Sequence, residues 1–191
     1  MITSDDIRAH GWRTLSDVLR SVRGVAVTND RNYEYAGFRG FSPPGDYTMR
    51  VLLLVDGHRM NSDVIGAAPG GADFPIDLDL VERVEIVRGP GSSVYGTSAL
   101  FGLVNIVTRR ELDAAATRFG AGIAGDRGRE TRASFEGMTT TGATWLVAGH
   151  AFDTRGAALY LPEYDSPATN AEVFEDGDRE RVRRGYARVS Q

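Results

Sequence analysis

The C-terminal part of the chain alternates apolar and polar residues with a period of two. Between residues 117 and 124, three apolar residues share one face of an extended strand: Phe119, Ala121 and Ile123. The same alternation returns around Phe135, Trp145 and Val189. The turns between the first three segments are short, and the link from Arg155 to Arg181 is long and acidic. This pattern is typical of membrane β-barrel strands, but a soluble antiparallel sheet has the same period.

The first part of the chain carries two helix-start signals. Thr3 with Asp6, and Thr14 with Asp17, have the spacing of a capping box with Asp in place of Glu. An apolar stripe follows the second box at helical spacing. Gly24 is expected to end that helix at its C′ position. Both signals predict short helices near the N-terminus.

Several strands are predicted between residues 25 and 108. The run 50–55 is continuously apolar after its arginine, which indicates a strand covered on both faces. Asp56-Gly57 then predicts a hairpin turn with a returning strand at 58–60. Residues 61–74 are predicted to form a surface loop, 80–88 and 102–108 further strands, and 92–100 one helical turn. Residues 1–110 are therefore expected to form a compact α+β domain.

Composition excludes several kinds of chemistry. The chain has 191 residues and a formal net charge of −4, and its 22 basic residues are all arginine. An acidic chain with scattered arginines is not expected to bind nucleic acid. The absence of lysine and cysteine excludes Schiff-base catalysis, a Walker lysine, disulfides and cysteine-ligated zinc.

The N-terminus lacks the basic and apolar regions of a signal peptide, and no segment reaches about 18 apolar residues. We therefore expect that the chain either lacks its front part or is not exported.

No motif assembles a catalytic, metal or cofactor site. Residues 91–98 have the glycine spacing of a phosphate-binding loop, but Thr97 stands at the lysine position, so a structural turn is favoured over a phosphate-binding enzyme. The three histidines, His10, His58 and His150, are not at metal-ligand spacing. We expect no enzymatic activity, no metal and no cofactor.

One combination of motifs is specific. The segments Val81–Pro90, Ser93–Gly96 and Gly102–Thr108 follow one another, with Phe38–Phe41 and Val55–Gly57 upstream. In this order they resemble the plug (cork) domain of TonB-dependent outer-membrane receptors. The resemblance implies a plug at residues 1–110, with a small mixed sheet and short helices. Residues 111–191 would be the first antiparallel strands of an incomplete transmembrane β-barrel.

The resemblance also implies a function. Receptors of this family take up scarce nutrients, such as ferric siderophores or cobalamin, across the outer membrane. The inner-membrane protein TonB supplies the energy through a short box ahead of the plug, and no such box precedes Met1. The expected ligand is therefore a metal chelate or a vitamin, and the expected location is the outer membrane.

Two sets of site residues follow from the matching motifs. Arg39 and Arg88 correspond to arginines that pair with barrel glutamates and hold the plug; alternatively, they are solvated sheet residues. The ligand-facing loops correspond to 31–35 and 61–73, with these expected contacts: Arg31, Asn32, Tyr33, Tyr35, Asn61, Ser62 and Asp63. The tyrosines have the alternative of packing against the barrel wall.

A different class of function remains open from the sequence. The polar N-terminus and the acidic composition also suit a soluble plug-like binding or interaction module that works without a barrel.

Overall fold

The structure is a computed structural model that describes residues 1–43, 45–109, 115–124, 128–160, 162, 173–174 and 178–190. The chain divides into two compact units, Met1–Arg110 and Glu111–Gln191, which are described in turn. The acidic residues 163–177 of the long link lie outside the described residues, apart from Val173 and Phe174.

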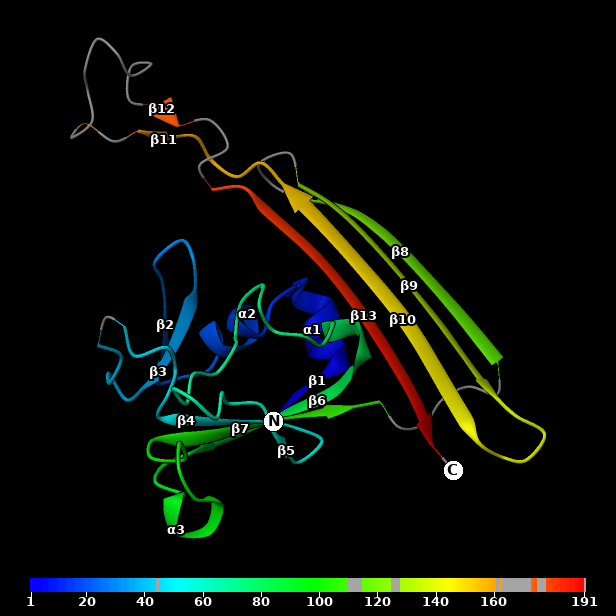
Figure 1. Ribbon diagram of the computed structural model, residues 1–191, viewed down its shortest axis with the longest axis horizontal. Coiled ribbons are helices and arrows are strands. Elements are labelled where there is room, and N and C mark those ends of the chain that lie inside the picture. Colours follow the sequence, from blue (N-terminus) through cyan, green and yellow to red (C-terminus); the bar gives the residue numbers. More distant parts are fainter. Residues whose placement is uncertain are drawn as a thin grey trace. The chain divides into compact units, whose positions relative to one another are not determined.

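Two short helices open the first unit, and both begin at the expected capping boxes (Figure 1). Helix α1 is Ser4–His10 and α2 is Leu15–Arg20. At α2, the Thr14 hydroxyl accepts from the Asp17 N–H at 3.1 Å, and the Asp17 carboxylate accepts from the Thr14 N–H at 3.0 Å. Each box therefore satisfies two N–H groups that the helix leaves unpaired. None of the helices in the described part of the chain has the length and apolar content needed to cross a membrane.

The expected role of Gly24 was wrong. Helix α2 ends at Arg20, and Ser21 caps it with right-handed backbone angles. Gly24 lies further along, with φ of +83°, and leads into the next strand. Its left-handed conformation therefore turns the chain into β2 rather than ending the helix.

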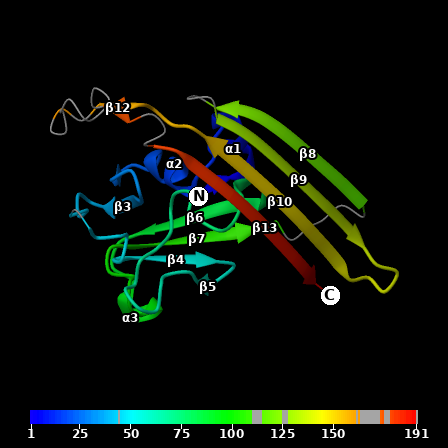
Figure 2. The same cartoon turned by 45° about the horizontal axis from the view of Figure 1, so that its top comes forward.

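A five-stranded mixed sheet forms the centre of the first unit, in the order β1-β6-β7-β4-β5 (Figure 2). Strand β7 runs parallel to β4, and the other neighbours are antiparallel. Its strands are β1 (Ile2–Thr3), β4 (Val51–Val55), β5 (His58–Arg59), β6 (Val81–Arg88) and β7 (Gly102–Thr108). A mixed sheet with few short helices confirms the α+β class.

The core of this unit runs through the parallel pair. Val51, Leu52 and Leu53 are all buried although they point alternately to opposite faces, and most of β7 is buried too. The 3-10 helix η1 (Leu78–Leu80) adds two further buried leucines. The prediction that strand 51–55 is covered on both faces is confirmed.

The Asp56-Gly57 turn joins β4 to β5 as predicted. Both residues have positive φ, 50° and 84°, as in a type I′ turn. The Asp56 carboxylate then reaches β7, where one oxygen accepts from the Thr108 N–H at 2.9 Å and the other from the Thr108 hydroxyl at 2.6 Å. One side chain therefore fastens the hairpin to the last residue of the neighbouring parallel strand.

A separate two-stranded hairpin, β2 (Val25–Asn29) with β3 (Glu34–Phe38), packs near α2. Strand β3 begins at Glu34, so Glu34 and Tyr35 belong to a strand and only residues 30–33 form the turn. At its other end, Phe38 is fully buried against Gly102. A Cβ at Gly102 would come within 3.0 Å of the Phe38 ring and 2.9 Å of the Val87 carbonyl.

The segment between β6 and β7 contains the predicted helical turn, α3 (Ser92–Tyr95). Arg59 of β5 holds the chain after it, donating to the Thr97 hydroxyl at 2.8 Å and the Ser98 hydroxyl at 2.9 Å. Thr97 is therefore part of a structural turn, as the sequence favoured.

The second unit is an antiparallel sheet in the order β13-β10-β9-β8. Its strands have 10 or 11 residues: β8 (Ala115–Ala124), β9 (Gly128–Met138), β10 (Thr144–Thr154) and β13 (Glu180–Ser190). A two-stranded sheet, β11 (Leu159–Tyr160) with β12 (Val173–Phe174), lies within the long link and was not expected from the sequence.

The two faces of this sheet have opposite character. The predicted apolar set is the exposed one: Ile123 is 93% exposed, Phe119 78% and Val189 76%. The other face carries ion pairs between Arg118 and Glu136 and between Arg132 and Glu130. This is the reverse of a water-soluble sheet, which buries its apolar face.

The two hydrogen bonds from Thr108 to the Asp56 carboxylate, which we call the Asp56 clamp, predict how a substitution at Asp56 changes stability. Replacing Asp56 by Ala removes two hydrogen bonds to Thr108. It also places alanine at a position with positive φ, a conformation that alanine seldom adopts. The free energy of unfolding of the first unit should therefore fall by about 2 kcal/mol. In a Trp145→Phe background, urea unfolding followed by Trp12 fluorescence reports this unit. Thr108→Val should cost less, since it removes only the hydroxyl bond. Equal stability of Asp56→Ala and the parent would contradict the clamp.

Candidate functional site

The turn between β2 and β3 is built on Asp30. One Asp30 carboxylate oxygen accepts from the N–H groups of Asn32 at 3.0 Å and Tyr33 at 2.7 Å. The other oxygen accepts from the Tyr35 hydroxyl. Arg31, with φ of +78°, donates its N–H to the Asn29 side chain at 2.5 Å. These bonds hold the turn in one conformation and leave the Arg31 and Asn32 side chains exposed.

The hydrogen bond between Asp30 and Tyr35 shifts the pKa values of the two groups in opposite directions. The Asp30 carboxylate, as the acceptor, raises the pKa of the Tyr35 phenol well above its usual range. The Tyr35 hydroxyl, followed by the Tyr33 N–H, lowers the pKa of Asp30. At neutral pH the pair is therefore a neutral phenol donating to a carboxylate, which is the stronger, charge-assisted kind of hydrogen bond.

Three tyrosines gather beside this turn. The Tyr47 ring makes edge contacts with Tyr33 at 5.9 Å and Tyr35 at 5.1 Å between ring centroids. Tyr33 is 50% exposed and Tyr47 38%, whereas Tyr35 is only 5% exposed. Tyr33 and Tyr47 therefore present an aromatic surface that Tyr35 supports from below.

Sequence reasoning missed Tyr47. Both Tyr47 and Thr48 have positive φ, 43° and 59°, in a region that non-glycine residues seldom adopt. Thr48 is held there because its hydroxyl accepts from the Ala36 N–H of β3 at 2.9 Å. Gly45 and Asp46 just before these positions are turn residues, but the contact of Thr48 with β3 could not be read from the sequence.

The predicted loop 61–73 has a buried anchor. Asn61 is 5% exposed, and its amide oxygen accepts from the Leu53 N–H at 2.8 Å. Its amide nitrogen donates to the carbonyls of Val51 at 3.0 Å and Gly66 at 2.8 Å. Asn61 therefore joins the loop to β4, and its polar atoms are occupied by the backbone.

Ser62 and Asp63 are exposed on the same loop, beside the exposed Val64 and Ile65. Further along, the Ala68 N–H donates to the Tyr47 carbonyl at 3.0 Å. Tyr47 therefore contacts both parts of the candidate site: its ring touches Tyr33 of the β2–β3 turn, and its carbonyl accepts from Ala68 of the loop. At its far end this loop is less exposed than predicted, since Ala68 and Phe74 are buried.

Arg39 and Arg88, the two arginines predicted to hold the plug as a latch, lie close together. Arg88 donates to the Arg23 carbonyl at 2.8 Å, and the Arg39 N–H donates to the neighbouring Gly24 carbonyl at 2.8 Å. A guanidinium nitrogen of Arg39 lies 3.7 Å from the position a Cβ would take at Gly89, the residue after Arg88. Arg23, whose carbonyl Arg88 contacts, is exposed as well and was not selected from any motif. We call Arg23, Arg39 and Arg88 the three-arginine group.

Among the described residues, no carboxylate lies within 4.0 Å of the guanidinium groups of Arg23, Arg39 or Arg88. Arg20 and Arg83, in contrast, each pair with two carboxylates. The three-arginine group is therefore a concentration of positive charge on the surface of an acidic chain.

The aromatic surface offers ring faces, one guanidinium and amide groups, and the described residues contain no group of three or more His, Asp or Glu side chains placed to hold a metal ion. The fold and these surfaces define a small α+β plug-type domain joined to a sheet whose apolar face is exposed.

Comparison with known proteins gives the family. Residues 1–103 match the family model described as TonB-dependent Receptor Plug Domain. The chain belongs to this family, and the resemblance drawn from the motifs is confirmed.

Two curated relatives are similar to the chain. It is 31% identical over 167 residues to the vitamin B12 transporter BtuB of Vibrio vulnificus, covering 85% of the chain and 26% of that protein. It is 36% identical over 118 residues to the iron-regulated outer membrane virulence protein of Vibrio cholerae, covering 58% of the chain and 17% of that protein. The chain thus spans about a quarter or less of these relatives, which are a transporter and an outer-membrane protein.

Solved structures are similar as well. The siderophore receptor PirA from Pseudomonas aeruginosa matches 99% of the chain and 31% of its own length, with a TM-score of 0.60 and 26% identity. The ferric yersiniabactin uptake receptor FyuA from Yersinia pestis matches 98% of the chain and 28% of its own length, with a TM-score of 0.72 and 20% identity. The second likeness concerns the fold alone.

The Asn61 anchor separates a structural residue from its exposed neighbours. Asn61→Ala leaves one buried N–H and two carbonyls without their partner, so it should lower the free energy of unfolding by about 3 kcal/mol. Ser62→Ala and Asp63→Ala should each change it by less than about 0.5 kcal/mol. Urea unfolding of the three variants measures this difference; equal losses would contradict the assignment of Asn61 as the anchor.

The Asp30–Tyr35 bond predicts a pH dependence. Because the folded pKa of Tyr35 is raised, this bond stabilises the protein below the unfolded tyrosine pKa of about 10, and the stabilisation declines as the pH rises above that value. In Tyr35→Phe this part of the alkaline decline should be absent. Asp30→Asn should shift one phenol to earlier ionisation in an ultraviolet tyrosinate titration; an unchanged titration curve would contradict the bond.

Proposed function

We propose that this chain forms the plug and adjoining barrel strands of a TonB-dependent receptor that takes up a scarce nutrient across the outer membrane. The observation that carries the proposal is the joining of a plug domain, in one chain, to strands of 10–11 residues with an exposed apolar face. Strands of this length and alternation suit a bilayer, with the apolar face toward lipid and the polar face inward.

The aromatic surface and its neighbouring loop are our candidate ligand contacts. Arg31, Asn32, Tyr33, Ser62 and Asp63 are exposed and available to a ligand. To these we add Tyr47. We propose that Tyr35 and Asn61 act by support, since their polar groups are engaged by Asp30 and by the backbone.

We propose that the ligand is a metal chelate or a vitamin. The relatives support both classes, since one is named a vitamin B12 transporter and PirA is named a siderophore receptor. The energy would come from TonB through a box ahead of the plug.

The three-arginine group suits the role of a latch. Arg39 and Arg88 lie side by side and carry positive charge without a carboxylate in the described part of the chain. We propose that barrel carboxylates supply the counter-charge, with bidentate arginine–carboxylate bonds that gain strength away from bulk water. Arg23 would keep Arg88 in position through its carbonyl.

Uptake in whole cells tests the proposal. Cells that express the full reading frame should accumulate either radiolabelled ferric siderophore or labelled cobalamin, and accumulation should stop when TonB is deleted. Arg31→Ala should raise the ligand concentration for half-saturation, because we propose that the exposed Arg31 guanidinium contacts the ligand. Arg39→Ala/Arg88→Ala should instead make cells permeable to large antibiotics, because the plug is held less firmly.

Several outcomes would count against this function. No energy-dependent uptake of either ligand class would reject the transport role. A purified chain that is monomeric and binds ligand without detergent would favour the soluble module. Identical permeability of the Arg39→Ala/Arg88→Ala cells and the parent would reject the latch alone.

A further inference from the structure

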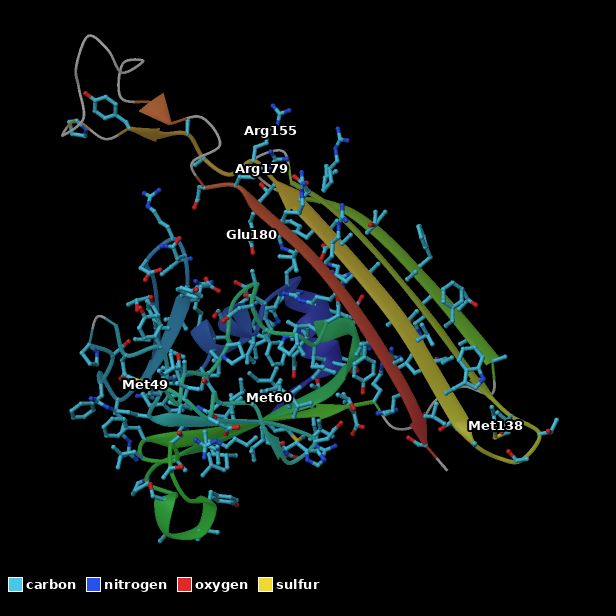
Figure 3. All side chains as sticks on the ribbon, viewed as in Figure 1. Met49, Met60, Met138, Arg155, Arg179 and Glu180 are labelled. Atoms are coloured by element: carbon cyan, nitrogen blue, oxygen red, sulfur yellow. The ribbon has the colours of Figure 1, made fainter. Side chains whose placement is uncertain are left out.

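One end of the four-stranded sheet is rich in arginine. Five exposed arginines lie at the end of the strands next to the long link, and we call them the arginine rim: Arg129, Arg155, Arg179, Arg181 and Arg183. Figure 3 shows Arg155 and Arg179 at this end, with Met138 at the opposite end of the sheet. The rim is therefore one localised surface feature of the second unit.

Strand register places part of the rim on the apolar face. Arg129, Asp153 and Arg181 are direct cross-strand partners on β9, β10 and β13, and Ile123 of β8 continues the same row. Arg183 lies one step inward in the next row, opposite Ala151. These side chains share the face that carries Phe119 and Val189, because residues two apart along a strand point the same way.

The rim has more positive than negative charge. Arg181 pairs with Asp153 at 2.7 Å, Arg179 approaches the same carboxylate at 3.8 Å, and Arg155 also interacts with it electrostatically. The other carboxylates described at this end are Asp178, Glu180 and Glu130, and Glu180 projects from the opposite face (Figure 3). Glu130 lies on that opposite face too, where it pairs with Arg132. Five rim arginines against four carboxylates leave the described part of this end basic.

Below the rim the same face carries no charge. Three successive cross-strand rows contain only apolar, glycine and threonine residues, and they end at Trp145 and Val189: Phe119, Ala133, Gly149, Gly185; Thr117, Phe135, Val147, Ala187; Ala115, Gly137, Trp145, Val189. A guanidinium group and a wide apolar surface therefore follow one another along β9 and β13. This is the pattern of a surface for an amphiphile with an anionic head.

We propose that the arginine rim binds the phosphate groups of lipid headgroups while the apolar rows contact the acyl chains. Guanidinium groups bind phosphate oxygens through paired, charge-assisted hydrogen bonds. Basic residues next to a bilayer also gain from an anionic lipid surface. The occupant is a lipid rather than free phosphate, because the apolar rows adjoin the charge on the same face. The inference rests on the proposed membrane location of the sheet and adds a lipid specificity to it.

Vesicle partitioning tests the rim with the full 191-residue chain. In a Trp12→Phe background, Trp145 lies on the apolar face and its quenching by brominated acyl chains reports insertion. The chain is diluted from detergent into phosphatidylcholine vesicles with and without phosphatidic acid. Arg129→Gln/Arg183→Gln removes two rim charges and leaves the Arg181–Asp153 pair in place. At low salt, it should weaken partitioning into the phosphatidic acid vesicles about tenfold or more and leave the neutral vesicles unchanged.

Matched variants control for charge and folding. Arg8→Gln/Arg83→Gln removes the same charge from the first unit and should partition like the parent. Arg129→Lys/Arg183→Lys retains the charge and should recover most of the anionic preference. Circular dichroism identifies any variant that loses strand content, and Arg129→Gln alone then serves as the milder test, with about a fivefold loss expected.

The outcomes separate this inference from the proposed function. If Trp145 is quenched equally in neutral and anionic vesicles, the sheet enters lipid but the rim does not recognise phosphate, and the inference is rejected alone. If inorganic phosphate at matched ionic strength abolishes the anionic preference, the rim is a free-anion site and the lipid assignment is rejected. If Trp145 is quenched in neither vesicle, the membrane location itself fails.

Discussion

The two hydrogen bonds between the Asp56 carboxylate and Thr108 hold the strands from which the two candidate surfaces of the first unit are positioned. They tie the left-handed Asp56-Gly57 turn to the end of β7, and so set the register of the only parallel strand pair in the described sheets. The start of β4 follows the segment of Tyr47 and Thr48, and the start of β7 packs on Phe38, next to Arg39. The aromatic surface and the arginine group are thus positioned from one strand pair.

Local patterns in the sequence were sufficient wherever local physics decides the structure. The capping boxes at Thr3 and Thr14, the Asp56-Gly57 hairpin and the alternation around Phe119 each depend on residues a few positions apart. The family followed from the order of several short motifs, and the fold class followed with it. These features require no knowledge of distant contacts.

The rest depended on contacts between distant segments. Tyr47 and Thr48 both have positive φ, and the Thr48 hydroxyl accepts from Ala36 of another strand. The turn residues Gly45 and Asp46 precede them in the sequence, but this contact with β3 could not be read from them. Asn61 had the composition of a loop residue, but its amide reaches Leu53 and Val51 and is buried. Gly24 carried a helix-end signal, yet its neighbours in β2 decide its role. Five of the seven predicted ligand contacts are exposed, as a ligand-facing surface requires. The burial of Tyr35 and Asn61, in contrast, could be seen only in the folded structure.

The contact between Gly102 and Phe38 has a consequence for how sequences of this fold can vary. At residue 102 a single methyl group would meet the Phe38 ring and the Val87 carbonyl together, so the strands β3, β6 and β7 converge with no spare volume. A change there is tolerated only with a smaller residue at 38 and a shifted β6 backbone, which are unlinked events in a mutating gene. Glycine at this position and an aromatic ring at 38 should therefore be inherited as a unit.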